Sequence, residues 1–286
     1  MPPNYFALIK LLFNEDVSKK IVLQMAYKQI SKIGFAKVLA VLLSACTVGV
    51  SSFIRIPQIR KIIDPKLLDD RIKVANGLSL ESYSIESFNY LIHVVFNSQN
   101  KNPFLDYGES LLMGIQNVII ILLIKFYRLR ETNEIPDLSN KSWTDSIKVV
   151  GEKLAQPVGI IVGTIIFLTQ VAPHQLISLL QVLNIPINII SKLPQIKQNH
   201  DLRTARHLST ITLRANVLGS IIRVFTSAQD LSTKRKKNKS SYNDWILLAG
   251  YITSLSLNSV LIGQSIIYDS KLVESKDDDD EEKKKV

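Results

Sequence analysis

Long apolar stretches, separated by short polar and basic segments, are the feature that most constrains this chain of 286 residues. A transmembrane helix needs about 20 mostly apolar residues, because the bilayer core holds no water to pair with backbone groups. Windows of this length predict seven spans, at about 37–57, 78–97, 107–127, 154–171, 174–194, 208–228 and 243–268. We therefore expect an all-α membrane protein with seven transmembrane helices.

The distribution of basic residues predicts which loops face the cytosol. The first, third and fifth loops, with the span ends beside them, carry fifteen Lys and Arg residues, whereas the second, fourth and sixth loops carry six. Cytoplasmic loops are enriched in Lys and Arg, so the C-terminus should be cytosolic and the N-terminus should lie on the opposite side of the membrane. The basic run Lys234–Lys239 in the sixth loop departs from this pattern, and its side of the membrane stays open.

Composition excludes several other classes of protein. The net charge of +10 does not indicate a nucleic-acid partner, because no basic segment is interleaved with aromatic residues and no zinc-finger spacing occurs. A single cysteine, Cys46, cannot form an internal disulfide, and the four histidines are scattered, so we expect neither metal nor cofactor. Membrane glycosyltransferases that use polyprenyl-linked sugars need an acidic pair on the side of the membrane away from the cytosol. The acidic pair Asp69-Asp70 lies in a predicted cytosolic loop and does not meet this need. We therefore expect a protein that is not an enzyme.

A short internal repeat divides the chain into two similar halves. Arg55-Ile56-Pro57-Gln58-Ile59-Arg60 corresponds to Lys192-Leu193-Pro194-Gln195-Ile196-Lys197, and each copy precedes a polar loop and a Leu-Ser pair. Both copies end a predicted span of the same orientation, so the halves should be parallel three-helix repeats joined by an inverting fourth helix. The predicted parts are an N-terminal lumenal segment at 1–36, a first repeat at 37–127, a cytosolic loop with linker helix at 128–171, a second repeat at 174–268 and a disordered cytosolic tail at 269–286.

The Pro-Gln pairs and their spacing resemble the PQ-loop repeat family, which includes sugar exporters of the SWEET type and lysosomal transporters of cystine and basic amino acids. Within that family, Arg223-Val224-Phe225-Thr226-Ser227-Ala228-Gln229 is similar to the mannose-P-dolichol utilization defect 1 proteins. Gly77–Leu80, Tyr107–Leu112 and Asn184–Pro186 share this similarity. The resemblance implies a bundle of three, one and three helices. It also implies an endoplasmic-reticulum membrane protein needed to use dolichol-phosphate mannose and glucose in N-glycan precursor and glycosylphosphatidylinositol (GPI) anchor assembly.

Three prolines are candidates for bends in the predicted helices. Pro57 and Pro194 stand at span ends, where a missing N–H either stops a helix or lets it flex as a hinge, and both alternatives stay open. Pro186 lies in mid-span between Asn184 and Asn188. A kink there frees backbone carbonyls, and we expect these residues to line a cavity.

Ionisable residues inside predicted spans should face the bundle interior or pair, since each costs about 2.5 to 3.5 kcal/mol to insert. A Glu86–Arg223 pair across the two halves would satisfy both residues, either as a structural ion pair or as a contact for a substrate headgroup. Arg55 and Lys192 lie beside the Pro-Gln pairs, and they are candidates for binding an anionic headgroup unless they only mark the cytosolic side. The candidate ligand cavity comprises Glu86, Asn117, Asn184, Asn188, Asn216 and Arg223.

The end of the chain, Lys283-Lys284-Lys285-Val286, places lysines third and fourth from the C-terminus. This arrangement resembles the dilysine retrieval signal of endoplasmic-reticulum membrane proteins, an address read by a receptor in the cytosol. The alternative is a solvated charge run, because an acidic run directly precedes the lysines. As a signal, Lys283 and Lys284 predict an endoplasmic-reticulum location.

These features predict two functions. In the first, the groove between the halves holds the headgroup of a dolichol-phosphate sugar, and the protein binds, presents or flips this lipid for lumenal glycosyltransferases. In the second, the protein is a secondary transporter of a small sugar or amino acid. Pro57 and Pro194 would then be the hinges for alternating access, and Glu86 would carry a coupled proton.

Overall fold

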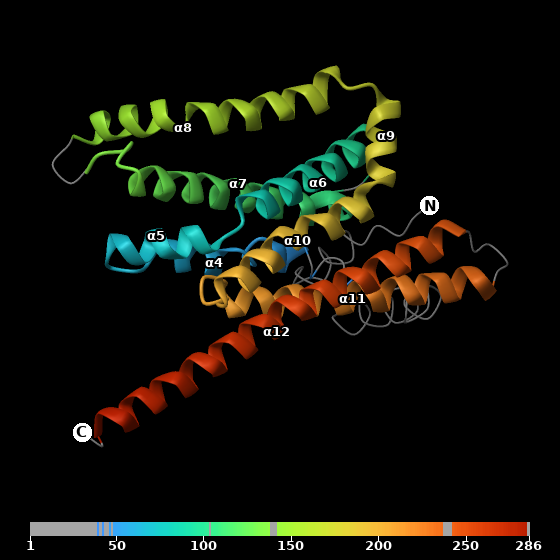
Figure 1. Cartoon of the computed structure of the whole chain (residues 1–286). Coiled ribbons are helices and arrows are strands. Elements are labelled where there is room, and N and C mark those ends of the chain that lie inside the picture. The colour runs from blue at the N-terminus through green and yellow to red at the C-terminus, as the bar shows by residue number, and fades with distance from the viewer. Residues whose placement is uncertain are drawn as a thin grey trace, which may run out of the picture. The chain divides into compact units, whose positions relative to one another are not determined.

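The computed structural model of this chain is helical, and no strand occurs in the part that it describes (Figure 1). It describes residues 48–102, 104–137, 142–236 and 242–284, together with Leu39, Leu42 and Cys46. The chain divides into two compact units, Met1–Cys46 and Thr47–Val286. The second unit contains α4 (Ile56–Ile63), α5 (Leu68–Gly77), α6 (Leu80–Gln99), α7 (Phe104–Glu131), α8 (Trp143–Ile166), the π-helix η1 (Phe167–Val171), α9 (His174–Val182), α10 (Asn184–Leu202), α11 (Thr210–Lys236) and α12 (Tyr242–Lys284).

Among the described residues, three stretches of helix are long and apolar enough to cross a membrane, and the bent pair α9–α10 is a fourth if it counts as one span. The three are Asp106–Glu131, Trp143–Val171 and Asp244–Tyr268. The helices α6 and α11 occupy the ranges of the second and sixth predicted spans but are less apolar, because polar and charged residues interrupt both. Most of the first predicted span, 37–57, lies outside the described residues. The prediction of an all-helical, multi-pass membrane protein is confirmed at this level.

The two Leu-Ser segments share an apolar core with α4 and α7. The helix α6 packs against α7, α11 packs against α12, and α10 contacts both α6 and α12. One apolar core contains Ile62 of α4, Leu78, Leu208 and Ile120 of α7, all of them buried. Burying these side chains together holds α4, α7 and the two Leu-Ser segments in one core.

The helix α8 lies along α7 and is otherwise open (Figure 1). Only 6% of its most apolar window is buried, and Ile160 is 62% exposed. An apolar surface of this extent marks contact with a membrane or another apolar partner. Its exposure agrees with a helix whose side chains face lipid.

The break between α9 and α10 lies at Leu183, where the two helix axes differ by 59°. Pro186 follows three residues later, and its missing N–H cannot bond to the carbonyl of Val182. The predicted bend near Pro186 is therefore present, and Asn184 begins the helix that follows it.

The two Pro-Gln prolines differ from each other in their helices. Near the first, the chain is helical at 48–51, turns through 52–55 and resumes as α4, in which Pro57 is the second residue. Pro194 lies inside α10, which continues to Leu202. Of the two alternatives for Pro194, a helix stop is therefore excluded, because a proline in mid-helix removes one backbone hydrogen bond without having to end the helix.

The last helix, α12, continues through the segment expected to be a disordered tail and ends at Lys284 (Figure 1). Neither Gly nor Pro occurs between Gly263 and Val286, so the sequence contains no strong signal to stop the helix. Lys283 and Lys284 are the last two residues of α12.

Nearby acids partly neutralise the basic end of α11. Lys234 Nζ lies 2.7 Å from Asp244 Oδ1 and 2.9 Å from Asp230 Oδ2. The hydrogen bonds from Lys234 to Asp244 and Asp230 raise the pKa of this lysine to about 12. One member of the basic run in the sixth loop therefore carries its own counter-charge, while 237–241 lie outside the described residues.

Candidate functional site

A cavity of about 480 Å³ lies between α6 and α7 on one side and α9, α10, α11 and α12 on the other. We call it the polar cavity, because most of its lining side chains are polar or charged. Five of the six predicted cavity residues line it, namely Glu86, Asn184, Asn188, Asn216 and Arg223. The sixth, Asn117, does not line the cavity but bonds to Glu86 from α7. The structure thus brings together residues from both predicted halves.

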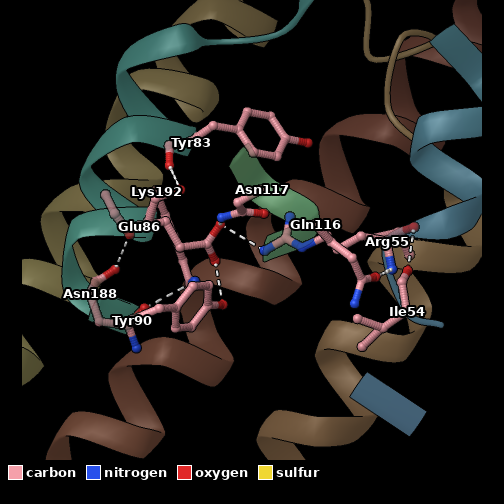
Figure 2. Close-up of polar contacts among 12 residues, drawn as sticks. Ile54, Arg55, Tyr83, Glu86, Tyr90, Gln116, Asn117, Asn188 and Lys192 are labelled. Carbon is pink, nitrogen blue, oxygen red and sulfur yellow. Dashed lines mark hydrogen bonds and ion pairs between the residues drawn. The ribbon is translucent and has the colours of Figure 1, made fainter. Parts of the chain in front are cut away.

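Glu86 is the centre of a buried network beside the polar cavity (Figure 2). Its Oε2 accepts hydrogen bonds from Arg55 at 2.7 Å and from Asn117 Nδ2 at 3.0 Å, and its Oε1 accepts one from the Tyr90 hydroxyl at 3.0 Å. Only 14% of the Glu86 side chain and 6% of the Arg55 side chain are exposed. Arg55 also lies over the Tyr83 ring, 5.5 Å from its centroid. A buried carboxylate is tolerated here because it is both paired and hydrogen-bonded.

Gln116 fixes the backbone that carries Arg55 (Figure 2). Its Oε1 accepts a hydrogen bond from the Arg55 N–H at 3.0 Å, and its Nε2 donates to the Ser51 carbonyl at 2.6 Å. These bonds satisfy backbone groups that the turn at 52–55 removes from helical pairing. Arg55 is therefore directed to Glu86 by a side chain of α7, and it is buried rather than placed at a membrane surface.

The predicted Glu86–Arg223 pair is wrong, because each residue has another partner. Arg223 of α11 forms an ion pair with Glu109 of α7, and its guanidinium lies 5.9 Å from the centroid of the Tyr251 ring. The expectation that Arg223 pairs across the two halves is nevertheless correct. Arg214, also inside a predicted span, is exposed and takes no part in this site.

Lys192 contributes a positive charge that the two ion pairs do not balance. It lines the polar cavity, and its Nζ donates to Asn188 Oδ1 at 3.4 Å without forming an ion pair among the described residues. Arg55 balances Glu86, and Arg223 balances Glu109. The two ion pairs and Lys192 together therefore carry one excess positive charge, next to the amide of Asn188, whereas Asp106 lines the cavity from an exposed position.

Two amide oxygens in the lining have no hydrogen-bond donor within the described part of the chain. These are Asn89 Oδ1 and Gln181 Oε1. Asn89 is 4% exposed and its Nδ2 donates to Asn184 Oδ1 at 3.3 Å, while Gln181 Nε2 contacts His93 at 3.0 Å. Buried acceptors of this kind normally bond to a ligand or to water. The sequence pattern did not single out Asn89, Tyr90 or Gln181 as site residues, although the period of α6 places Asn89 and Tyr90 near the face of Glu86.

The glutamines of the two Pro-Gln pairs form matching clasps between the halves. Gln58 Nε2 donates to the His207 carbonyl at 2.9 Å, and its Oε1 accepts from the Ser209 N–H at 2.6 Å. Gln195 Nε2 donates to the Gly77 carbonyl at 3.1 Å, and its Oε1 accepts from the Ser79 N–H at 2.7 Å. Each glutamine thus holds the Leu-Ser segment of the other half by the backbone on both sides of its leucine.

His207 packs against Gly77 beside the second clasp. A Cβ added to Gly77 would overlap the His207 side chain, so glycine permits this close approach. Burial, with a smaller effect from the nearby positive charge of Lys61, lowers the pKa of His207 to about 4. The histidine is therefore neutral at physiological pH.

A smaller cavity of about 60 Å³ lies beside the clasps and is lined by Arg55, Gln58, Lys192 and Gln195, among others. The structure thus gathers both predicted headgroup residues and both Pro-Gln glutamines around one space. Across the described ranges, no three His, Cys, Asp or Glu side chains come together in a way that could hold a metal ion.

The fold and this site define a helical, multi-pass membrane protein with a polar cavity between its helices. Residues 176–234, which cover α10 and most of α9 and α11, match the PQ loop repeat. The match includes the second Pro-Gln pair, Lys192 and Arg223, in agreement with the resemblance found in the sequence. No solved structure matches the chain significantly.

Proposed function

We propose that this chain is a non-catalytic endoplasmic-reticulum membrane protein that makes dolichol-phosphate mannose and glucose usable as donors for N-glycan precursors and GPI anchors. Seven spans, as three, one and three helices, would place the C-terminus and the retrieval lysines Lys283 and Lys284 in the cytosol and the N-terminus in the lumen. Lumenal glycosyltransferases would be the partners that receive the lipid-linked sugar.

The excess charge of Lys192 is the observation that carries this proposal. A sugar phosphodiester brings one negative charge, and an ammonium group in a partly buried site binds such an anion more strongly than in water. The amide NH₂ group of Asn188 offers further donors beside it. The free oxygens of Asn89 and Gln181 would accept hydrogen bonds from sugar hydroxyls. The polar cavity therefore offers complementary groups to both parts of a phosphorylated sugar.

Deleting the gene and analysing the lipid-linked oligosaccharides tests this function. We expect truncated precursors to accumulate and wild-type chain to restore full-length ones. Lys192→Gln should restore them poorly, whereas Lys197→Gln removes an exposed charge from the same helix and should restore them fully. Full-length precursors in the deletion strain would contradict the proposal.

A secondary transporter of a small sugar or amino acid is the second candidate. It is favoured by two ion pairs at the polar cavity, one joining the turn before α4 to α6 and the other joining α7 to α11, since rearranging such pairs can open one side of a cavity at a time. Purified chain in liposomes should then show saturable uptake that Glu86→Gln abolishes. A protein that only binds or presents lipid would show no such uptake.

A further inference from the structure

A second, apolar cavity of about 500 Å³ lies between α8 and the pair α6–α7. We call it the apolar groove, because aliphatic side chains form most of its lining. Along α7 it extends from Ser110 to Lys125, a rise of about 22 Å. Its α8 wall contains Pro157, Ile160 and Ile165, on the least buried of the three long apolar helices.

The apolar groove adjoins the polar cavity at Tyr90 and Ser110, which line both. Tyr90 directs its hydroxyl to Glu86 Oε1 at 3.0 Å on the polar side. On the groove side, a Cβ placed on Gly114 would lie 3.5 Å from Tyr90 Cβ, an ordinary contact distance, so Gly114 lies directly beside Tyr90. An amphipathic tyrosine therefore separates a polar space from an apolar one.

We infer that the apolar groove binds the hydrocarbon chain of a polyprenyl phosphate whose sugar-phosphate headgroup occupies the polar cavity. This inference rests on the proposed function and assigns the part of the ligand that the polar cavity cannot hold. A chain alone gains little by leaving lipid for an apolar groove, since bilayer hydrocarbon is equally apolar. A chain anchored by its phosphate at Lys192 is retained beside the junction at Tyr90 and Ser110.

The test uses the full chain in phosphatidylcholine nanodiscs and a dolichyl phosphate probe that carries a photoreactive diazirine on its chain. We expect mass spectrometry to find labelled peptides on α6, α7 and α8, and excess dolichyl phosphate to compete. Gly114→Phe, which fills the groove, should lower this labelling about tenfold. Ile160→Trp on the opposite wall should lower it as well, and keeps the test valid if the first variant folds poorly.

Gly163→Phe is the matched control, since Gly163 is exposed on α8 with no atom near its added Cβ, and labelling should stay unchanged. Equal labelling of the groove by a diazirine phosphatidylcholine would overturn the inference, because an ordinary lipid would then be the occupant.

The binding of soluble mannose 1-phosphate, measured in a separate experiment, distinguishes this inference from the proposed function. Binding of mannose 1-phosphate that Lys192→Gln abolishes, with the diazirine probe labelling only other surfaces, overturns this inference and leaves the proposed function standing. Absence of binding by both probes overturns both.

Discussion

The amide oxygen of Gln58 accepts a hydrogen bond from the backbone N–H of Ser209 at 2.6 Å, across 151 residues of sequence. Gln195 makes the equivalent bond to Ser79 at 2.7 Å, across 116 residues. Each clasp satisfies one N–H and one carbonyl at the start of the opposite helix. The glutamine of the Pro-Gln pair therefore connects the two halves, while its proline removes a backbone N–H donor from its own helix.

Removing a clasp should therefore destabilise the protein. Gln58→Ala and Gln195→Ala each leave a buried N–H and a buried carbonyl unpaired, and each such group costs about 1 to 3 kcal/mol. We expect each variant to lower the midpoint of thermal unfolding in detergent. Gln198→Ala removes one hydrogen bond from a half-buried side chain of α10 and should lower it less. Equal midpoints for Gln58→Ala and wild type would contradict the clasp.

The approach of His207 to Gly77 leads to a second prediction. Gly77→Ala forces His207 to move and should destabilise the protein by about 1 to 3 kcal/mol. Gly77→Ala with His207→Ala should recover part of this loss, because the smaller side chain makes room. Gly151→Ala in α8, where open space surrounds the glycine, should stabilise by about 0.5 to 1 kcal/mol. Unfolding free energies of the four proteins provide the comparison.

The buried Arg55–Glu86 pair should show strong non-additivity. Arg55→Met or Glu86→Gln alone leaves an uncompensated buried charge and should cost about 3 to 5 kcal/mol, whereas the double variant should cost less than the sum. The exposed Asp70–Lys73 pair is the reference, and breaking it should cost about 0 to 1 kcal/mol. Strictly additive losses for Arg55 and Glu86 would show that the pair is not coupled.

Stability should fall with acid because of His207. Its pKa is about 4 in the folded protein and about 6.5 when unfolded, so the unfolded chain binds more protons between these values. The stabilisation is complete above about pH 6.5 and is lost as the pH falls towards 4, by about 3 kcal/mol in all. His207→Asn should flatten the dependence of the unfolding midpoint on pH in this window. A wild-type slope retained in that variant would assign the effect to other groups.

The membrane class and much of the site composition could be predicted from sequence, because both depend on local properties. Apolar length alone predicts which segments are helical and span-like, and the cost of burying charge predicts that Glu86 and Arg223 need partners. Which partner each one takes depends on the rotation and depth of neighbouring helices. Glu86 therefore paired with Arg55, and Arg223 with Glu109, instead of with each other.

The sequence by itself determined the apolar helices, the repeated Pro-Gln and Leu-Ser segments, the bend near Pro186 and the polar residues that must avoid lipid. Each of these follows from residue type and spacing within a short stretch of chain. Only the tertiary structure decided that Gln58 and Gln195 clasp opposite halves, that Lys192 forms no ion pair with any described residue, and that Tyr90 separates a polar cavity from an apolar groove. These relationships join residues far apart in the chain, so they arise from how helices pack and not from the period of any one of them.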